Sequence, residues 1–396
     1  MTSRRRFLVL GIVAWGMLVT LLRAIRLPND YAESHWLVDY RFGFVKRGLV
    51  GTAFTALSRS THLPQAAWSI ALLSSLFLAI SCGALLWASH RILARLQWSR
   101  NSFLLVSVFV TSPFVVMSAH LIGYYDDIVL VLTLLSILLV LRGRFWTAGL
   151  LQTFAVLVHE ISLLTGLPSV LFCVWMVVRR GPAPRSVSAF APFTLPLLTF
   201  AGIASYLSVL DQTHLQSTLT TRLSCFAFIA PDYQVLVPEW LVTSFAEFVR
   251  TDRGHFLRRL ADPGSLVAVL PSLLVMATFV ATHFETRRPA RDATWIACVA
   301  LAPLAMHLLA CDTARIWCMA IAGLFWVALV QAELGSPAAS GRTEPFRWLA
   351  WAALVTNMMV RVPLMDHRLD RFTLVQRLLL YAPLLIGAAI GSPRQP

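Results

Sequence analysis

The chain has 396 residues, of which 58% are hydrophobic and only 13% are charged, and its mean hydropathy is +0.71. Soluble domains carry about 25% charged residues, so this composition excludes an ordinary soluble protein and predicts an integral membrane protein. The formal net charge is +14. In a membrane protein such basic residues gather in cytoplasmic loops and meet anionic lipids, so we expect membrane lipids and no nucleic acid as partners.

Hydropathy predicts an all-α polytopic fold with about twelve membrane-spanning helices, because about 20 apolar residues cross the hydrocarbon core. The predicted segments lie near residues 7–26, 67–89, 102–120, 128–142, 147–162, 164–178, 188–210, 264–283, 293–311, 317–333, 348–363 and 374–391. The first segment lacks a cleavage pattern of small residues, so we expect it to remain as an uncleaved helix.

Arginine clusters occupy alternate connections between these segments. The clusters are Arg4/Arg5/Arg6, Arg91/Arg95/Arg100, Arg142/Arg144, Arg179/Arg180/Arg185, Arg287/Arg288/Arg291 and Arg342/Arg347. The positive-inside rule predicts that these connections and both termini are cytoplasmic. We therefore expect a multi-pass protein of the inner (plasma) membrane. Lys46 is the only lysine, and this arginine bias indicates a GC-rich, bacterial genome.

Residues 147–178 are long enough only for two short helices or for one long tilted helix. Both flanking loops are rich in arginine, so an even number of crossings is required. We predict a tight pair of helices whose outer turn lies near residues 159–166. A re-entrant pair that does not fully cross satisfies the same requirement.

Two outer connections are long, within a chain that we treat as a single transmembrane domain over residues 1–396. Residues 27–66 contain an apolar segment, 48–57, that favours a short interfacial helix. Residues 211–263 are too few for a separate domain, and we expect helices that cap the outer face.

Asp39 is the first candidate catalytic residue. It follows His35 by four positions, which puts both side chains on one face if this segment is helical. A carboxylate there suits a base that takes a proton from an acceptor hydroxyl. A helix cap or an ion pair with Arg41 accounts for the same residue, so both interpretations stay open.

Asp126 and Asp127 lie just before the apolar segment 128–142. The helix dipole accounts for one acidic residue there, but a pair at the edge of a membrane is costly unless it is used. We predict either a catalytic role, contacts to sugar hydroxyls, or a divalent metal such as Mg²⁺ or Mn²⁺ that bridges to phosphate.

His159 and Glu160 interrupt a long apolar stretch, and ionisable residues inside a membrane indicate function. Leu163 excludes the HExxH zinc motif. Asp312 and Arg315 are spaced for a helical ion pair, and we expect Asp312 to orient Arg315 toward an anionic head group. Another outer cluster, Asp366, His367, Arg368, Asp370 and Arg371, is typical of a solvated loop.

Nucleotide-binding and hydrolase signatures are absent from the sequence, which disfavours ATP-driven transport and NAD chemistry. An N-in polytopic chain with an Asp in a long first outer loop resembles the GT-C superfamily of membrane glycosyltransferases. Asp39 lies where the first-loop acid of that superfamily is found. Asp126 and Asp127, in Gly-Tyr-Tyr-Asp-Asp-Ile-Val-Leu, lie where its second acidic motif is found. The resemblance is architectural and covers about residues 1–210, and the first loop has no acidic-x-acidic motif.

The resemblance implies a polyprenyl-phosphate sugar donor, a glycan, lipid or protein acceptor, and inversion at the anomeric carbon on the outer, periplasmic face. One of the three aspartates then acts as the base. Cations must stabilise the departing phosphate, and the expected contacts are Lys46, Arg47 and Arg315, with His159, Glu160 and Asp312 beside them.

Other functions remain open at this point. A lipid-linked polysaccharide polymerase or ligase would use outer-loop arginines such as Arg222, Arg250 and Arg253. A proton-coupled secondary transporter would use the buried acidic and histidine side chains as a proton relay. An acyltransferase or a membrane scaffold is a third possibility.

Overall fold

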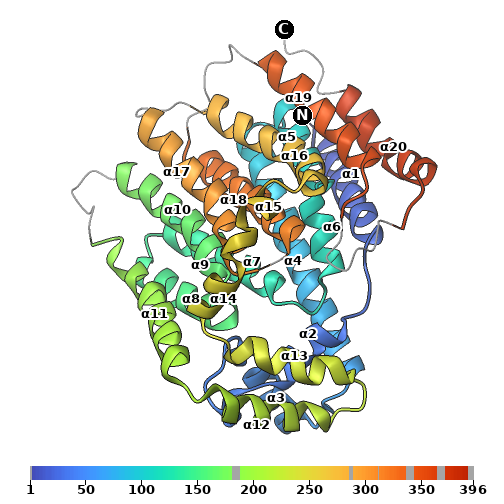
Figure 1. Cartoon of the computed structure of the whole chain (residues 1–396). Helices are drawn as coiled ribbons and strands as arrows, with labels where there is room; N and C mark the ends of the chain where they lie inside the picture. Colours follow the sequence, from blue (N-terminus) through green and yellow to red (C-terminus); the bar gives the residue numbers. More distant parts are fainter. Residues whose placement is uncertain are drawn as a thin grey trace.

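The computed structural model describes residues 2–180, 188–284, 289–310, 312–335, 343–363 and 371–390. Within these ranges every regular element is a helix, as predicted (Figure 1). The predicted cytoplasmic residues Arg185, Arg287, Arg288 and Arg342 lie outside the described residues. So do Asp366, His367, Arg368 and Asp370 of the predicted outer cluster.

Seven helical segments of the described chain are long and apolar enough to cross a membrane. They are α1 (Ser3–Leu22), α4 (Ala67–Arg95), α5 with α6 (Arg100–Val110 and Pro113–His120), α9 with α10 (Ser162–Thr165 and Leu167–Arg180), η2 with α11 (Ala191–Phe193 and Thr194–Val209), α16 (Pro263–Thr282) and α18 (Thr313–Leu334). A polytopic membrane protein is therefore supported, and the expected count of about twelve spans is not confirmed.

The other predicted spans coincide with helices that are too short to be counted. These helices are α7 (Asp126–Leu141), α8 (Phe145–Val158), α17 (Pro289–Leu301), α19 (Thr343–Met359) and α20 (Leu374–Ile390). They contain 13 to 17 residues. At 1.5 Å per residue they reach about 20 to 26 Å, which is less than the hydrocarbon core of about 30 Å. The apolar sequence therefore predicts where each helix lies, whereas the length of the helix decides whether it can cross the membrane.

The centre of the bundle is formed by α18, which packs against α16, α10, α17 and α4. The ring of Phe325 in α18 stacks on Phe109 of α5, with ring centroids 3.6 Å apart. After α5 the chain turns at Thr111 and Ser112, because Pro113 disfavours helical geometry in the residue before it. Most of the surface of α5, α6 and α18 is covered by other helices, as expected for the centre of the bundle.

Arginine-rich connections meet at one end of the bundle. Arg91 and Arg95, late in α4, both bind the carboxylate of Glu333 near the end of α18. Arg347 in α19 donates to the side chain of Asn101 at the start of α5. Residues of two predicted cytoplasmic clusters thus form contacts at this end, and the side of the membrane that it faces stays a prediction.

A layer of shorter helices covers the opposite end of the bundle, away from the N-terminus (Figure 1). The first long connection forms α2 (Asp30–Leu37), η1 (Tyr40–Phe42) and α3 (Gly48–Thr61), and the predicted helical segment 48–57 lies within α3. The second forms α12 (Gln212–Ser224) and α13 (Pro231–Val242) in this layer, and then α14 (Phe245–Asp252), η3 (Arg253–His255) and α15 (Phe256–Leu260), which lead from the layer back toward α18 (Figure 1). We call this layer the outer cap. A further short element, η4 (Ala302–Leu308), joins α17 to α18.

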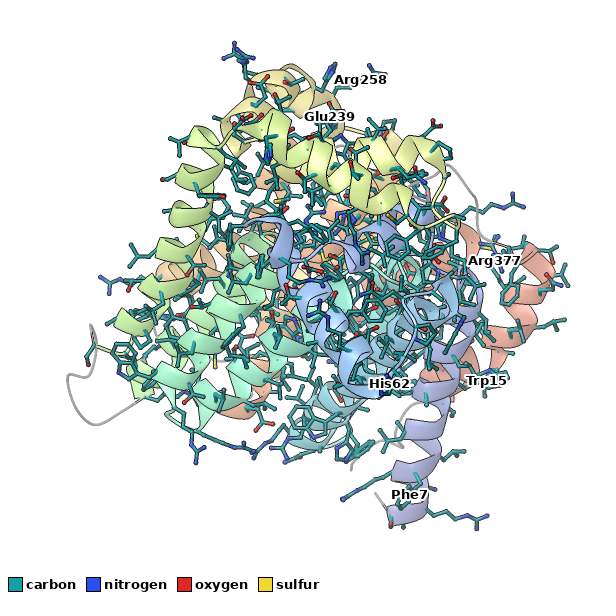
Figure 2. All side chains as sticks on the ribbon, turned by 90° about the horizontal axis from the view of Figure 1, so that it is seen from below. Phe7, Trp15, His62, Glu239, Arg258 and Arg377 are labelled. Atoms are coloured by element: carbon teal, nitrogen blue, oxygen red, sulfur yellow. The ribbon has the colours of Figure 1, made fainter. Side chains whose placement is uncertain are left out.

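Apolar contacts join the two halves of the outer cap. Trp36 of α2 and Phe54 of α3 form one cluster with Leu219 and Val237 of α12 and α13. At Gly51 a Cβ atom would lie 1.8 Å from the carbonyl oxygen of Val38, so only glycine lets α3 pack this closely. Seen from the cap side, Glu239 and Arg258 lie at one edge and Phe7 of α1 projects at another (Figure 2).

Candidate functional site

Turns and helix ends gather several predicted residues beneath the outer cap. Asp126 opens α7 directly after a turn in which Gly123 adopts φ +93°, a conformation that favours glycine. His159 and Glu160 occupy the break between α8 and α9, where His159 is extended. This break lies within residues 159–166, where the outer turn was predicted. Arg315 lies in the first turn of α18.

Arg315 is held on several sides. Its Nε and Nη2 atoms donate to the two carboxylate oxygens of Asp126, at 2.8 and 2.7 Å. Its Nη1 atom donates to Asp312 at 3.2 Å, as the three-residue spacing predicted. Nη2 also donates to Nε2 of His159 at 3.2 Å, and the guanidinium lies 5.4 Å from the ring centre of Tyr124. A planar guanidinium suits this fork of acceptors better than an ammonium group would.

Arg47 forms a second pair of the same kind with Glu160. Its Nε atom lies 3.1 Å from both carboxylate oxygens, and Nη2 also donates to one of them. Nη1 donates to the hydroxyl of Tyr31 at 3.1 Å and to Nε2 of His35 at 3.4 Å. Arg47 itself has φ +62°, a left-handed conformation that costs a non-glycine residue about 1–3 kcal/mol. Such strain often accompanies functional sites.

A histidine connects the two arginine pairs. Because guanidinium groups only donate, Nε2 of His159 accepts from Arg315. Nδ1 lies 3.3 Å from a carboxylate oxygen of Glu160, and the backbone N–H of Ile161 also donates to it, at 3.2 Å. We call the connected residues the arginine network; its members are Arg47, Asp126, His159, Glu160, Asp312 and Arg315.

The arginine network contains two guanidinium groups and three carboxylates, so it carries one excess negative charge while His159 is neutral. Its side chains are nearly buried; those of Glu160 and Arg315 are each 8% exposed. Buried charges require close partners and good geometry, which these contacts supply. An incoming anion would therefore have to displace at least one carboxylate from an arginine.

His35 stays neutral beside the network. Burial first, and then the charge of Arg47, lower the pKa of His35 to about 3. Its Nδ1 atom lies 2.7 Å from the carbonyl oxygen of Tyr31 and donates to it, which leaves Nε2 to accept from Arg47. His35 therefore orients Arg47 without adding charge.

Asp39 lies apart from the network. Its side chain is fully buried and accepts two bonds from the Arg41 guanidinium, at 2.8 and 2.6 Å, and one from Thr55 at 3.0 Å. Burial alone would raise the pKa of Asp39, but the bonds from Arg41 and Thr55 lower it below its usual range. The predicted pair with Arg41 is present, and Asp39 is enclosed by it.

Lys46 also points away from the network, although it precedes Arg47. Its Nζ atom donates to the carbonyl oxygen of Thr243 at 2.7 Å and lies over the rings of Phe245 and Phe248, at 5.1 and 4.6 Å. Burial lowers the pKa of Lys46 to about 7. Lys46 thus ties the first outer connection to the second.

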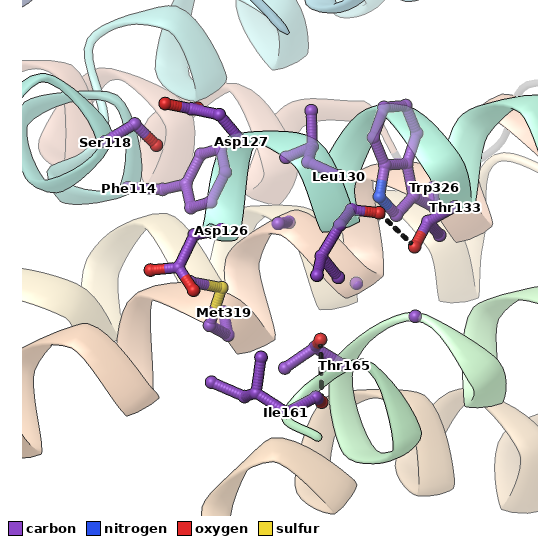
Figure 3. Close-up of a pocket in the computed structure, with 14 residues that line it drawn as sticks. Phe114, Ser118, Asp126, Asp127, Leu130, Thr133, Ile161, Thr165, Met319 and Trp326 are labelled. Atoms are coloured by element: carbon purple, nitrogen blue, oxygen red, sulfur yellow. Dashed lines mark hydrogen bonds between the residues drawn. The ribbon is translucent and has the colours of Figure 1, made fainter. Parts of the chain in front are cut away.

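Asp127 faces a different side of α7 from Asp126, since consecutive helical residues are about 100° apart. It hydrogen-bonds Ser81 of α4. Figure 3 shows the two carboxylates pointing in different directions. A cavity of about 20 Å³ lies beside them, enough for about one water molecule.

Metal ligands do not converge in the part of the chain that the structure describes, where no group of three or more His, Cys, Asp or Glu side chains could hold an ion. A bridging Mg²⁺ or Mn²⁺ at Asp126 and Asp127 stays a prediction.

The sequence did not single out two aromatic residues that complete the network. Tyr31 binds Arg47, Tyr124 lies against Arg315, and the two rings stack with centroids 5.3 Å apart. The four-residue spacing from Tyr31 to His35 is a signal that puts both on one helical face.

Comparisons with known proteins add no identification. No family model matches this chain, and no curated protein or solved structure matches it. Function is therefore argued from the site itself.

Proposed function

We propose that this protein is a GT-C-like membrane glycosyltransferase. It transfers a sugar from a polyprenyl-phosphate-linked donor to a glycan, lipid or protein acceptor at the outer face, for cell-surface glycan assembly. The observation that supports this most is the pair of buried arginines, Arg47 and Arg315, joined through His159 and Glu160 beneath the outer cap. Two guanidinium groups suit a phosphate that gains charge as it leaves.

Different residues of the arginine network have different roles in the proposed reaction. The acceptor oxygen attacks the anomeric carbon, the bond from that carbon to the phosphate oxygen breaks, and the phosphate leaves with the electron pair. Arg47 and Arg315 stabilise that phosphate. Because the arginines are already paired, the donor phosphate displaces a carboxylate, and the freed carboxylate takes the acceptor's proton.

Asp126 is the carboxylate that we assign as this base. It shares Arg315 with the proposed phosphate position, so donor binding releases it where the reaction occurs. Asp39 is enclosed by Arg41 and Thr55, and its side-chain hydrogen bonds go to these residues and not to the network arginines in the described part of the chain. Asp127 lies on the α4 side of its helix.

The proposal includes a topology. The short helices α7, α8, α17, α19 and α20 complete about twelve crossings, with flanking residues reaching the interface. The arginine-rich end faces the cytoplasm with both termini, and the outer cap faces the periplasm of a bacterial inner membrane. Membrane lipids surround the bundle, and nucleic acid is not a partner.

The test is transfer of labelled sugar by purified protein reconstituted in lipid, supplied with polyprenyl-phosphate sugars and a mixed acceptor pool. Asp126→Asn, Asp39→Asn and Asp127→Asn are compared, each with and without EDTA. Loss of transfer in Asp126→Asn alone supports the assignment, and loss in EDTA that Mg²⁺ or Mn²⁺ restores supports a metal. Absence of transfer from every lipid donor by folded protein would overturn the proposal. Products of many added repeats would instead favour a polymerase.

One observation favours a second candidate, a proton-coupled transporter. The ring nitrogens of His159 lie 3.2 Å from Arg315 and 3.3 Å from Glu160, and a histidine beside a buried carboxylate is a group that can carry a proton. Proteoliposomes that carry a pH-sensitive dye distinguish the two. Substrate-dependent proton uptake that His159→Gln abolishes favours transport.

A further inference from the structure

An open hollow of about 830 Å³ lies at the side of the molecule where α1 ends and the outer cap begins. Its lining comes from the connection after α1, the N-terminus of α2, the middle of α4, α13 and the residue Arg371. These segments are far apart in sequence. Polar and apolar groups both line the hollow.

The rim of the hollow faces the lipid side of α4. Ser75 is exposed on that helix, between Leu72 and Leu76, whose side chains are 59% and 52% exposed. Leu27, which also lines the hollow, is 74% exposed. Large exposed apolar residues on a spanning helix contact acyl chains, so the hollow opens sideways to the bilayer.

Positive charge dominates the polar part. Arg26 and Arg371 line the hollow with a single carboxylate, Asp30. Nε of Arg26 donates to the carbonyl oxygen of His120 at 2.8 Å, which fixes the position of its guanidinium. The backbone of Arg371 donates to the carbonyl oxygen of Arg23 at 3.1 Å. Asp30 already accepts a hydrogen bond from the backbone of Ala230 in the outer cap, at 2.6 Å.

The inner wall of the hollow adjoins the arginine network. Asn29, in the lining, caps α2 by accepting from Ala32 at 3.1 Å, and α2 then carries Tyr31. Ile122, also in the lining, is followed by the turn at Gly123 and by Tyr124. Tyr31 and Tyr124, which follow these two lining segments in the chain, stack on each other and contact the network through Arg47 and Arg315.

We propose that this hollow is a binding site for the phosphate of a membrane lipid, held by Arg26 and Arg371 while its acyl or prenyl chains lie along α4. Two guanidinium groups at the bilayer edge attract anionic lipid, each by about 1 kcal/mol. The lipid is either a polyprenyl phosphate or an ordinary anionic phospholipid, because both present the same phosphate chemistry. The site does not depend on the proposed transferase activity.

Native mass spectrometry of the purified full-length protein, titrated with polyprenyl monophosphate, phosphatidylglycerol or phosphatidylcholine, tests the site. The variants are Arg26→Gln with Arg371→Gln, and the control is Arg59→Gln with Arg250→Gln, two outer arginines that do not line the hollow. We expect the first double variant to bind anionic lipid about 30-fold more weakly, which is about fivefold per arginine, and the control to match wild type. Equal binding by all three proteins would overturn the proposal.

A second variant distinguishes loss of the lipid site from misfolding of the protein. Ser75→Trp fills the lipid-facing rim at an exposed position and leaves both arginines in place, so it should weaken binding without lowering the melting temperature. Unchanged binding in this variant also argues against the site. Stronger binding of polyprenyl phosphate than of phosphatidylglycerol identifies the polyprenyl lipid as the ligand, and equal binding identifies a bulk phospholipid.

Discussion

Arg315 and Asp126 are 189 positions apart in the chain, yet they form a two-point ion pair with distances of 2.7 and 2.8 Å. The pair joins the first turn of α18 to the first turn of α7 beneath the outer cap. His159 contacts the same guanidinium and extends the pair toward Glu160 and Arg47. The proposed chemistry depends on this junction.

Replacement of Arg315 by lysine keeps the positive charge and removes the planar guanidinium group, which donates to several acceptors at once. Lysine cannot bind both oxygens of Asp126 and also reach His159 and Asp312, so we expect sugar transfer to fall by about 100-fold or more. The measurement is initial-rate transfer in proteoliposomes. Arg347→Lys, at the arginine-rich end, is the control and should stay within about threefold of wild type. Equal rates in the two variants would remove Arg315 from the mechanism.

A double-mutant cycle can measure the coupling energy between Arg47 and Glu160. Glu160→Gln alone leaves a buried guanidinium without its carboxylate, so we expect a loss of about 3–5 kcal/mol in the free energy of unfolding. Arg47→Gln with Glu160→Gln should lose less than the two single changes together, with a coupling above about 1 kcal/mol. Denaturation in detergent measures all four proteins.

A control cycle uses the exposed pair of Arg250 and Glu247, whose side chains are 73% and 45% exposed. Solvent screens such a pair, so its coupling should stay below about 0.5 kcal/mol. Similar coupling energies in the two cycles would show that burial of Arg47 and Glu160 adds nothing.

Lys46 predicts a pH dependence of stability. The pKa of Lys46 is about 7 in the folded protein, whereas an unburied lysine has a pKa of 10.5. Between these two pH values the unfolded chain therefore binds more protons than the folded protein does. The free energy of unfolding therefore rises with pH from about 7 to about 10.5, by about 2 kcal/mol up to pH 9. Lys46→Met should stabilise the protein relative to wild type most at pH 6, and this advantage should shrink by pH 9.

The control for Lys46 is Lys46→Arg, which keeps its charge throughout this range and should lack the pH-dependent part. Melting temperatures in detergent at pH 6, 7, 8 and 9 provide the comparison. A constant difference between wild type and Lys46→Met at all four pH values would contradict a lowered pKa at Lys46.

Substitution of Asp126 should lower sugar transfer, whereas substitution of Asp39 should lower stability. Asp126→Asn removes the proposed base, so we expect transfer to fall by about 10²–10⁴-fold. Asp39→Asn weakens the bonds to Arg41 and Thr55, so we expect a loss of about 1–3 kcal/mol in stability and transfer within a few-fold of wild type per folded molecule. Transfer assays normalised to folded protein, together with melting curves, separate these results. Complete loss of transfer in folded Asp39→Asn would move the base to Asp39.

Cys225 provides a test of orientation. It is an exposed cysteine at the end of α12 in the outer cap. A membrane-impermeant maleimide added to intact spheroplasts should label it, and Cys225→Ser should remove that label. Arg144→Cys, in the exposed turn between α7 and α8, should be labelled only after the membrane is opened. The reverse pattern would invert the proposed topology.

The sequence by itself determined the helical class, the membrane setting and the ends of helices where polar residues gather. Hydropathy and arginine clusters are local properties, so they can be read within about 20 residues, and Arg91, Arg95 and Arg347 indeed meet at one end. The pairing of Asp312 with Arg315 was likewise readable, because three-residue spacing on a helix brings side chains together.

Only the tertiary structure decided which of these polar residues share a site. Asp39 and Lys46 are close to Arg47 in sequence, but Asp39 binds Arg41 and Lys46 binds the carbonyl of Thr243. Asp126 and Asp127 are neighbours, yet helical geometry sends them to α18 and to α4. The physical reason is that contacts across 113 and 189 positions, as in Arg47 with Glu160 and Arg315 with Asp126, depend on how whole helices pack, and no local pattern specifies that packing.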